Sequence, residues 1–283
     1  MGEISTVGIV GSGIMGSGLA EVAARSGFDV VVRSRSRHGA EGVLAGVTAN
    51  LDRQVAKGKL ENAERDAVIS RIQPTDHLGR LAECDLVIES IVEDLATKRE
   101  LFAELEQIVK PDGILATNTS TLPVVELAVA TQRPDRVCGI HFFNPAPLMK
   151  LVEVVRPLTA SDDTIKTAMG FATACGKDAI EVTDRAGFVV NALLFPYLNN
   201  AVRMLENGTA AREDIDTAMQ GGCNFPMGPL ALLDLVGLDT SVSILDALYA
   251  EFRDPNYAAV PTLRRMVAAG QLGRKTKRGF YEY

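Results

Sequence analysis

A glycine-rich turn between a short apolar run and a helical pattern constrains the fold of this chain more than any other feature. The run from Ile4 to Val10 predicts a buried strand, and a helical pattern after the glycines continues to about Ser26. A second, valine-rich strand is predicted from Phe28 to Val32. Strand, glycine turn, helix and strand form one βαβ unit, which is typical of a parallel sheet covered by helices.

The turn has the G-x-G-x-x-G spacing of dinucleotide-binding folds. Its residues are Gly11, Ser12, Gly13, Ile14, Met15 and Gly16. The first glycine permits the tight turn, the second lets a pyrophosphate approach the backbone, and the third packs the helix against the strand. Free N–H groups at the helix start then face the phosphates. We therefore expect these six residues to bind a dinucleotide. The alternative is a glycine-rich turn with a structural role alone.

The end of the second strand indicates which nicotinamide cofactor to expect. An NAD site usually carries Asp or Glu there, about 20 residues after the glycines, to hold the ribose 2′-hydroxyl. Here that position is Ser34, flanked by Arg33, Arg35 and Arg37. A short hydroxyl among guanidinium groups suits a 2′-phosphate. The sequence predicts that Ser34 and Arg35 bind NADP in preference to NAD. A solvated basic loop beside an NAD site is the alternative.

Strands and helices alternate through the remainder of the first two thirds of the chain. Apolar runs predict further strands at Leu86–Ile91, Ile114–Thr117, Val137–His141, Leu151–Val155 and Ala179–Val182. Helical patterns lie at Lys98–Val109, Pro123–Ala130 and Asp162–Cys175. This alternation predicts an α/β fold with a Rossmann-type doubly wound sheet.

Two segments depart from this alternation. A charged stretch at about residues 40–72 has helical spacing, so we expect two helices joined near Gly58 as an inserted helical arm. After residue 184 no convincing strand follows, which predicts a dinucleotide-binding Rossmann domain over residues 1–184 and an all-helical C-terminal domain over residues 185–283. Helices are predicted in it at Gly187–Glu206, Asp214–Gln220, Pro229–Leu235, Asp239–Phe252 and Pro261–Ala269.

Composition excludes several classes of protein. With 29 Lys and Arg against 36 Asp and Glu, the net charge is −7, and the chain lacks the broad positive field of a nucleic-acid binder. The four cysteines form no C-x-x-C pair, so no metal site is expected, and their sparseness fits a reducing compartment. No apolar run reaches the roughly 18 residues needed to span a bilayer, and no basic segment precedes Ile4. We expect a cytoplasmic protein with no membrane partner.

Histidine is the usual proton acceptor near neutral pH, and the chain has three. His38 and His77 lie in charged stretches, which predicts exposure. His141 instead ends an apolar strand at the carboxyl edge, where ligands of such sheets bind. The residue pattern alone leaves a structural and a catalytic role open for His141.

Several motifs along the chain together resemble the short-chain L-3-hydroxyacyl-CoA dehydrogenases, closest to the bacterial 3-hydroxybutyryl-CoA dehydrogenases. They are Asn118–Thr121, His141–Pro147, Met149–Glu153, Gly187–Asn191, Glu213–Asp216, Pro226–Pro229 and Gly279–Tyr281. The resemblance covers essentially the whole chain. It implies an oxidoreductase of fatty acid metabolism that interconverts (S)-3-hydroxybutyryl-CoA and acetoacetyl-CoA, or their short-chain analogues, with NADP or NAD. It also implies a homodimer formed through the C-terminal domain.

The resemblance assigns four catalytic residues. It makes His141 the base and pairs it with Glu153, which lies in an otherwise apolar strand where an unpaired carboxylate is costly. It makes Ser120 and Asn191 ligands of the reacting hydroxyl and carbonyl groups, which they can polarise without adding charge. Taken singly, Glu153 could face water at a sheet edge, Ser120 could cap a helix, and Asn191 could be an ordinary polar helix residue.

The resemblance also implies ligands for the cofactor and for coenzyme A. Glu93, Lys98, Ser120 and Asn144 match positions near the nicotinamide half of the cofactor, and Lys275 matches a basic residue that approaches it. Arg53 and Lys57 are four apart on the helical arm, share one face and match basic positions that contact coenzyme A. A solvated helix face is the alternative for this last pair.

Two departures from the family pattern and two other functions stay open. The family often has arginine where Ala192 stands and glycine where Lys277 stands. One alternative is a relative acting on a free hydroxy acid or sugar acid, although such a substrate would not need the cradle for coenzyme A that the helical arm offers. A dinucleotide-binding protein without turnover could keep the glycines but need not retain the four residues Ser120, His141, Glu153 and Asn191 together.

Overall fold

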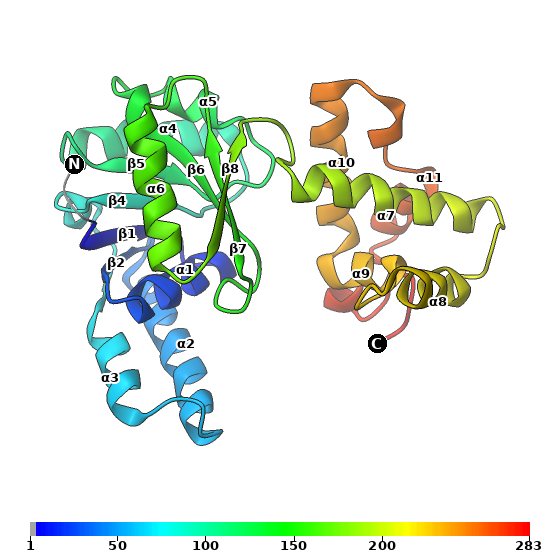
Figure 1. The fold of residues 1–283 in the computed structure, drawn as a ribbon, viewed down its shortest axis with the longest axis horizontal. Helices are drawn as coiled ribbons and strands as arrows, with labels where there is room; N and C mark the ends of the chain where they lie inside the picture. The colour runs from blue at the N-terminus through cyan, green and yellow to red at the C-terminus, as the bar shows by residue number, and fades with distance from the viewer. Residues whose placement is uncertain (1–3) are drawn as a thin grey trace. The chain divides into compact units, whose positions relative to one another are not determined.

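A computed structural model of the protein, which describes residues 4–283, divides the chain into two compact units (Figure 1). The first, Met1–Asp184, combines a sheet with flanking helices, and the second, Arg185–Tyr283, is helical. The predicted fold class, a Rossmann-type α/β sheet followed by a helical C-terminal region, is confirmed. No helix among residues 4–283 is long and apolar enough to cross a membrane.

The sheet of the first unit has eight strands in the order β3-β2-β1-β4-β5-β6-β7-β8. Neighbouring strands are parallel except for β6 and β7, which are antiparallel. The strands are β1 (Thr6–Val10), β2 (Asp29–Arg33), β3 (Ile72–Thr75), β4 (Leu86–Glu89), β5 (Ile114–Thr117), β6 (Val137–Phe142), β7 (Leu151–Arg156) and β8 (Asp178–Thr183).

The strand order opens a crevice at the carboxyl end of β1. From β1 the chain runs to β2 and β3 on one side, and then returns to β4 on the other side. The segments that follow β1 and β4 therefore diverge, which is the place where ligands bind in doubly wound sheets. Gly11 directly follows β1, and Ser90 directly follows β4.

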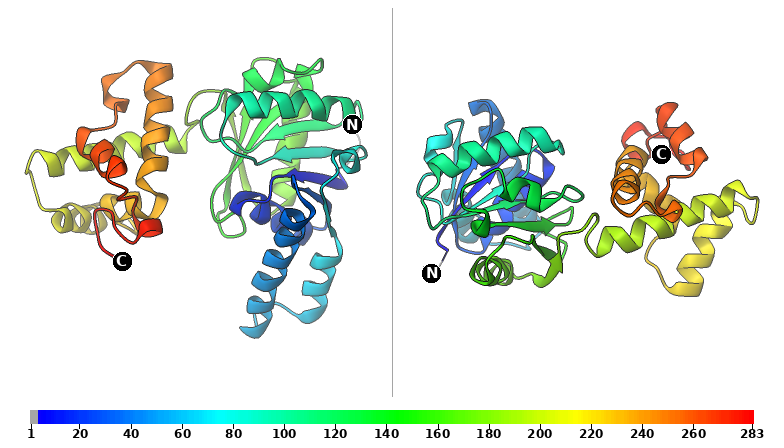
Figure 2. Two further views of the ribbon diagram at one scale, coloured as in Figure 1. Left: turned by 180° about the vertical axis from the view of Figure 1, so that it is seen from behind. Right: turned by 90° about the horizontal axis from the view of Figure 1, so that it is seen from above.

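Helices cover both faces of the sheet. In Figure 1 α1 (Ile14–Arg25) and α6 (Asp162–Ala174) lie in front of it, and the reverse view in Figure 2 brings α4 (Leu95–Ile108) forward on the opposite face. The short α5 (Val124–Ala128) packs beside α4 and β6. Buried side chains of α1, α6 and the sheet, such as Ile9, Leu19 and Phe171, form one apolar core that holds the glycine turn against the strands.

The predicted helical arm is present as α2 (Arg37–Ala56) and α3 (Asn62–Ser70), which turn near Gly58. One detail of the prediction is wrong, because Ile72 was assigned to the arm and instead opens β3. This strand pairs with β2 alone, at the edge of the sheet. An edge position tolerates Pro74, which lacks the N–H that a central strand needs. A four-residue strand that contains proline carries too little pattern to be predicted.

The second unit is built from helices around its own apolar core. They are α7 (Val190–Glu206), α8 (Arg212–Cys223), α9 (Pro229–Val236), α10 (Leu238–Phe252) and α11 (Pro261–Ala268). Leu198, Leu233 and Leu245 are among its fully buried residues. Helix α7 begins three residues later than predicted, because Gly187 and Phe188 adopt positive φ angles of 72° and 47°. No strand of the sheet lies within residues 185–283.

Candidate active site

The histidine that the sequence singled out lies directly opposite Glu153. The antiparallel register of β6 and β7 makes them partners, and such partners extend to the same face of a sheet. His141 Nδ1 lies 2.8 Å from Glu153 Oε2. His141 is 4% exposed and Glu153 is 0% exposed, so the alternative of a glutamate that faces water is wrong.

The other ring nitrogen of His141 meets Ser120. Ser120 Oγ, on the loop after β5, lies 3.0 Å from His141 Nε2. Because a carboxylate only accepts hydrogen bonds, the pairing with Glu153 puts a proton on Nδ1 and leaves Nε2 of the neutral ring as the basic atom. Nε2 therefore lies beside a hydroxyl at the carboxyl edge of the parallel strands, in position to exchange a proton.

Ser120 is held in place by its backbone. Its N–H donates to Glu93 Oε1 over 3.0 Å, and the hydroxyl of Thr119 donates to the same oxygen. Glu93 Oε2 lies 3.2 Å from Lys98 Nζ, which is also 2.6 Å from Glu89 Oε1. Three of the predicted residues, Ser120, Glu93 and Lys98, are thus brought together, and Glu89 joins them.

Glu89 was missed by the reasoning from sequence. It is the last residue of β4 and is fully buried. In the sequence it reads as the polar residue that ends an apolar run. The signal that could have found it is the spacing, since a lysine on the following helix, Lys98, lies nine positions later.

The glycine turn is closely packed at both ends and open in the middle. A Cβ at Gly11 would lie 2.2 Å from the carbonyl oxygen of Ser90, and one at Gly16 would lie 2.2 Å from that of Gly11. A Cβ at Gly13 would meet no atom within 4 Å. Gly13 also precedes α1 without any side-chain cap, so the first N–H groups of the helix are available to an anion.

Two further residues of the turn, Ile14 and Met15, point in different directions. The side chain of Ile14 is 77% exposed at the start of α1. Met15 instead packs partly against the apolar core. Their contribution to a bound pyrophosphate is therefore expected from their backbone N–H groups.

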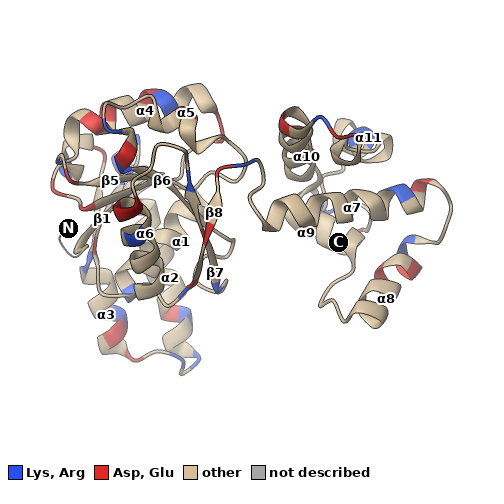
Figure 3. Cartoon of the chain, turned by 45° about the horizontal axis from the view of Figure 1, so that its top comes forward, with Lys and Arg blue, Asp and Glu red and all other residues tan. Residues whose placement is uncertain are grey.

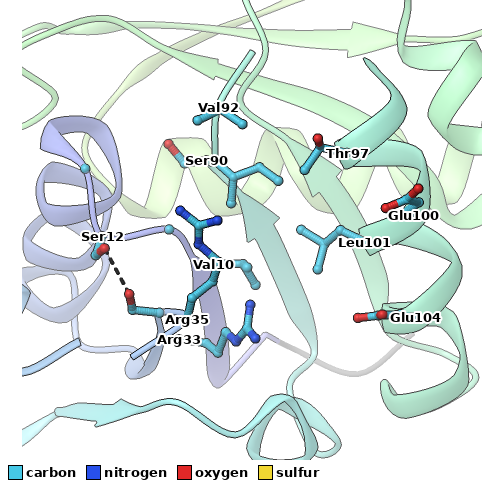
Figure 4. Close-up of a pocket in the computed structure, with 14 residues that line it drawn as sticks. Val10, Ser12, Arg33, Arg35, Ser90, Val92, Thr97, Glu100, Leu101 and Glu104 are labelled. Carbon is cyan, nitrogen blue, oxygen red and sulfur yellow. Dashed lines mark hydrogen bonds between the residues drawn. The ribbon is translucent and has the colours of Figure 1, made fainter. Parts of the chain in front are cut away.

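A cavity of about 540 Å³ opens between the ends of β1, β2 and β4 and the start of α4 (Figure 4). Its lining comprises Val10, Gly11, Ser12, Gly13, Arg33, Ser34, Arg35, Ser90, Ile91, Val92, Thr97, Glu100, Leu101 and Glu104. The turn that was predicted to bind a dinucleotide and the basic loop after β2 thus share one cavity. Ser34 is 8% exposed, and its hydroxyl lies 3.0 Å from that of Ser12.

The three arginines around Ser34 have different surroundings. Figure 4 shows Arg33 and Arg35 reaching into the cavity, and Arg33 Nε is buried with no hydrogen-bond partner among the described residues. Arg37 does not line it. Arg37 is the first residue of α2 and pairs with Glu41 one helical turn later, at 2.7 Å. In the sequence Arg37 is a third basic neighbour of Ser34, but the structure directs it to Glu41 and away from the cavity.

An acidic wall faces the two arginines. Glu100 and Glu104 line the cavity from α4, on the side opposite Arg33 and Arg35 in Figure 4. Neither glutamate forms an ion pair within 4 Å with either arginine in the part of the chain that the structure describes. Their i, i+4 spacing on an amphipathic helix is too common a pattern to mark them as site residues in the sequence.

The other predicted ligands lie outside this cavity. Asn144 is exposed in the loop after β6. Arg53 and Lys57 are exposed at the end of α2, where Figure 3 shows basic segments. Asn191, 8% exposed on α7, belongs to the second unit. Lys275 also belongs to the second unit, where it lies in the 3₁₀ turn Arg274–Thr276.

Lys275 has a partner in its own unit. Its Nζ lies 2.5 Å from the carboxylate of Asp239 on α10. Burial alone would raise the pKa of Asp239, but the ammonium of Lys275 and the backbone N–H groups of Thr240 and Asp239 together outweigh this effect and lower it. Within residues 4–283, no group of three or more His, Cys, Asp and Glu side chains is arranged to hold a metal ion.

Comparisons with known proteins agree with this arrangement of motifs. Residues 6–185 match the family model for the NAD binding domain of 3-hydroxyacyl-CoA dehydrogenase, and residues 187–283 match the model for its C-terminal domain. The two models together account for the whole sequence after the first five residues except residue 186.

Full-length relatives give the same result. The 3-hydroxybutyryl-CoA dehydrogenase of Mycobacterium tuberculosis is 48% identical over 99% of both chains. That of Clostridioides difficile is 46% identical over 97% of this chain and 98% of its own. The crystal structure of (S)-3-hydroxybutyryl-CoA dehydrogenase from Ralstonia eutropha superposes with a TM-score of 0.97 at 43% identity and covers 99% of each chain. The resemblance predicted from the motifs is confirmed, and the chain belongs to the 3-hydroxyacyl-CoA dehydrogenase family.

Proposed function

We propose that the protein interconverts (S)-3-hydroxybutyryl-CoA and acetoacetyl-CoA, or the corresponding short-chain 3-hydroxyacyl and 3-oxoacyl esters, by hydride transfer with NADP. The observation that carries this proposal is the contact series Ser120, His141 and Glu153 at the carboxyl edge of a sheet whose glycine turn lines a cavity. The full-length relatives named 3-hydroxybutyryl-CoA dehydrogenase support the choice of substrate.

His141 acts as the base in oxidation and as the acid in reduction. In oxidation its Nε2 takes the proton of the 3-hydroxyl group, and Glu153 stabilises the imidazolium that forms and holds the ring in its orientation. In reduction Nε2 returns this proton to the oxygen of the 3-oxo group. When bound, the nicotinamide would supply the redox chemistry, by accepting a hydride from C3 of the substrate in oxidation and returning one to C3 in reduction.

Hydrogen bonds to the substrate oxygens complete the proposed site. Ser120 Oγ lies 3.0 Å from the reacting edge of His141, so a substrate oxygen placed at Nε2 would lie within its reach. We assign Asn191 to the same role, with its amide as a neutral donor. The side chains of Ser120 and Asn191 are both neutral, so they can polarise the substrate oxygen without adding a charge beside it.

The cavity suits a dinucleotide that carries a 2′-phosphate. Space at Gly13 and uncapped N–H groups at the start of α1 fit a pyrophosphate. Ser34 carries no carboxylate to hold a ribose 2′-hydroxyl or repel a phosphate, and Arg33 and Arg35 reach into the cavity beside it. Guanidinium groups bind phosphate through paired, charge-assisted hydrogen bonds. We therefore propose NADP as the preferred cofactor, with NAD as the second choice.

The remaining predicted ligands keep their proposed roles. Glu93, Lys98, Asn144 and Lys275 are assigned to the nicotinamide half of the cofactor. Arg53 and Lys57, which are exposed, are assigned to the phosphates of coenzyme A. In the described residues neither makes a hydrogen bond or an ion pair with a neighbouring side chain, so both cations are available to a ligand.

We also propose a homodimer and a reducing, cytoplasmic location. The C-terminal unit exposes large apolar side chains that a partner could cover, among them Leu193 at 73% and Leu235 at 48%. All four cysteines are free. Sedimentation of the purified protein would determine whether it is a dimer.

The test of this function is the initial rate of acetoacetyl-CoA reduction with NADPH and with NADH, with His141→Ala as the control. We expect fast oxidation of NADPH that the substitution abolishes. Fast turnover with NADH alone would keep the reaction and reject the assigned cofactor. Turnover of free acetoacetate but not of the thioester would favour the free-acid alternative, and cofactor binding without any turnover would favour a non-catalytic protein.

A further inference from the structure

Glu89 is fully buried near the proposed site, although no step of the reaction uses it. Its Oε1 accepts hydrogen bonds from the backbone N–H of Ile91 and from Lys98 Nζ, each over 2.6 Å. Its Oε2 accepts one from the hydroxyl of Thr117 over 2.8 Å. A buried carboxylate is costly without such donors. Glu89 does not line the cavity, so any effect on the reaction must pass through a neighbour.

Lys98 is the neighbour that connects Glu89 to the site. It is 1% exposed, and its ammonium lies between Glu89 Oε1 at 2.6 Å and Glu93 Oε2 at 3.2 Å. Glu89 is the closer of the two carboxylates, and its side chain is completely enclosed, whereas that of Glu93 is 40% exposed. A buried ammonium depends strongly on its partner carboxylate. Glu89 is therefore the fixed anchor that decides where Lys98 lies.

Glu93 passes this constraint on to the reacting groups. Its Oε2 faces Lys98, while its Oε1 accepts the backbone N–H of Ser120 over 3.0 Å. Ser120 Oγ in turn lies 3.0 Å from His141 Nε2. One continuous series of contacts thus runs from β4 through α4 to the edge of His141 at which the proton moves.

We propose that Glu89 is a positioning residue for the reaction. Its charge holds Lys98, Lys98 holds Glu93, and Glu93 fixes the backbone of Ser120, so that its hydroxyl stays on His141 Nε2. The inference rests on the proposed function for its kinetic part, because it assumes that His141 and Ser120 act on the substrate. The competing interpretation is an ion pair that stabilises β4 and α4 and leaves the geometry of Ser120 unaffected.

Three variants separate these interpretations. Glu89→Gln keeps the shape of the side chain and removes its charge. Because the ammonium left behind can hinder folding, Lys98→Met and the double variant Glu89→Gln/Lys98→Met are made beside it. The double variant replaces a buried charge pair by neutral groups, a change that folded proteins often tolerate.

The first measurement does not depend on turnover. The imidazole NMR signals of the three histidines are recorded in the unmodified protein and in each variant that folds. His38 and His77 are exposed, so they serve as internal controls. We expect the Nε2 signal of His141 to shift in Lys98→Met and to shift equally in the double variant, because contact with Ser120 is lost in both. An unchanged His141 signal in all variants would overturn the inference whether or not the protein turns over acetoacetyl-CoA.

The second measurement is a kinetic cycle at saturating cofactor. We expect Lys98→Met and Glu89→Gln each to lower kcat by at least about 10-fold, as small misplacements of reacting groups do. The double variant should lose no more than Lys98→Met alone, because Glu89 acts through Lys98. A lower melting temperature with unchanged kcat would overturn the inference. The inference would also be overturned if Glu89→Gln lowered kcat by the same factor in the unmodified protein and in Lys98→Met, because Glu89 would then act independently of Lys98. Failure of the proposed function would show separately, as an inactive unmodified protein.

Discussion

His141 and Glu153 are register partners on the antiparallel strands β6 and β7, with 2.8 Å between Nδ1 of the ring and Oε2 of the carboxylate. The strands themselves set this distance, since residues paired across a sheet have their Cβ atoms about 5 Å apart. Both side chains are almost completely buried, so water competes little for either partner. The pair is thus formed before any ligand arrives.

Replacing Glu153 by glutamine tests what this carboxylate contributes. The amide keeps the shape but cannot stabilise an imidazolium, and its NH₂ group can impose the wrong tautomer on His141. We expect kcat for acetoacetyl-CoA reduction to fall by about 10²- to 10⁴-fold, with little change in KM. Glu181→Gln is the matched control, because Glu181 lies on the neighbouring strand β8 and pairs with Arg156 at the surface. A kcat for Glu153→Gln within about 3-fold of the control would contradict the assigned role.

The glycine turn predicts opposite results for two alanine substitutions. A Cβ at Gly13 meets no protein atom within 4 Å, so Gly13→Ala should fold with an unchanged melting temperature. The same methyl group would occupy the space assigned to the pyrophosphate, and cofactor affinity should be largely lost. A Cβ at Gly16 would lie 2.2 Å from the oxygen of Gly11, so Gly16→Ala should lose about 1–3 kcal/mol of stability. Thermal unfolding and NADPH titration of both variants check this, and normal NADPH binding by Gly13→Ala would reject the placement.

Cofactor selection should depend on two of the three arginines near Ser34. We expect Arg33→Ala and Arg35→Ala each to raise the Kd for NADPH by about 10- to 100-fold, the equivalent of about 1.5–3 kcal/mol, through loss of charge-assisted bonds. The Kd for NADH should change little, because NADH has no 2′-phosphate. Arg37→Ala is the control, since Arg37 pairs with Glu41 and does not line the cavity. Equal losses for NADPH and NADH would indicate that the arginines serve the adenine or the pyrophosphate.

Asp85 should stabilise the fold in a pH-dependent way. Burial alone would raise its pKa, but hydrogen bonds from Lys110 and from the backbone N–H groups of Thr6 and Ser5 outweigh this effect and lower the pKa to about 2. Because the folded pKa lies below the unfolded one, the contribution is complete above the unfolded pKa of about 4 and is lost as the pH falls toward 2.

The variant Asp85→Asn measures this contribution. At pH 7 we expect a loss of about 1–3 kcal/mol in the free energy of unfolding, and the difference should shrink as the pH falls from about 4 to about 2. The kcat should not change, because Asp85 precedes β4 at the amino end of the parallel strands, away from the site edge. Asp112→Asn, at an exposed position in the same region, is the control. A difference in unfolding free energy that is constant with pH would refute the assignment.

The sequence was most informative where a pattern repeats or where chemistry demands a particular residue type. The strand, glycine turn and helix around Gly13 were predictable because three glycines at fixed spacing have few other uses. His141 stood out because it ends an apolar strand, and the motif resemblance supplied its pairing with Glu153. The antiparallel register that brings them together depends on hydrogen bonds between strands, which a linear pattern does not encode.

The features that could not be predicted from the sequence depend on where its residues lie in three dimensions. Arg35 and Arg37 look alike in the sequence, but α2 begins at Arg37 and directs it to Glu41. Glu89 and Lys98 are separated by the turn between β4 and α4, so their contact appears only once both elements are placed. The strand β3 was missed because its four residues include a proline, and only pairing with β2 stabilises it as a strand.

The hairpin of β6 and β7 makes the contact between His141 and Glu153 tolerant of insertions in one place and intolerant of them in another. His141 and Glu153 face each other through strand register, so residues inserted near the exposed tip at Leu148 would leave the pair intact. One residue inserted within β7 before Glu153 would move the carboxylate to the opposite face of the sheet. During evolution the loop between the strands can therefore be lengthened without loss of this contact, whereas an insertion or deletion inside β7 takes the carboxylate away from His141 in a single step.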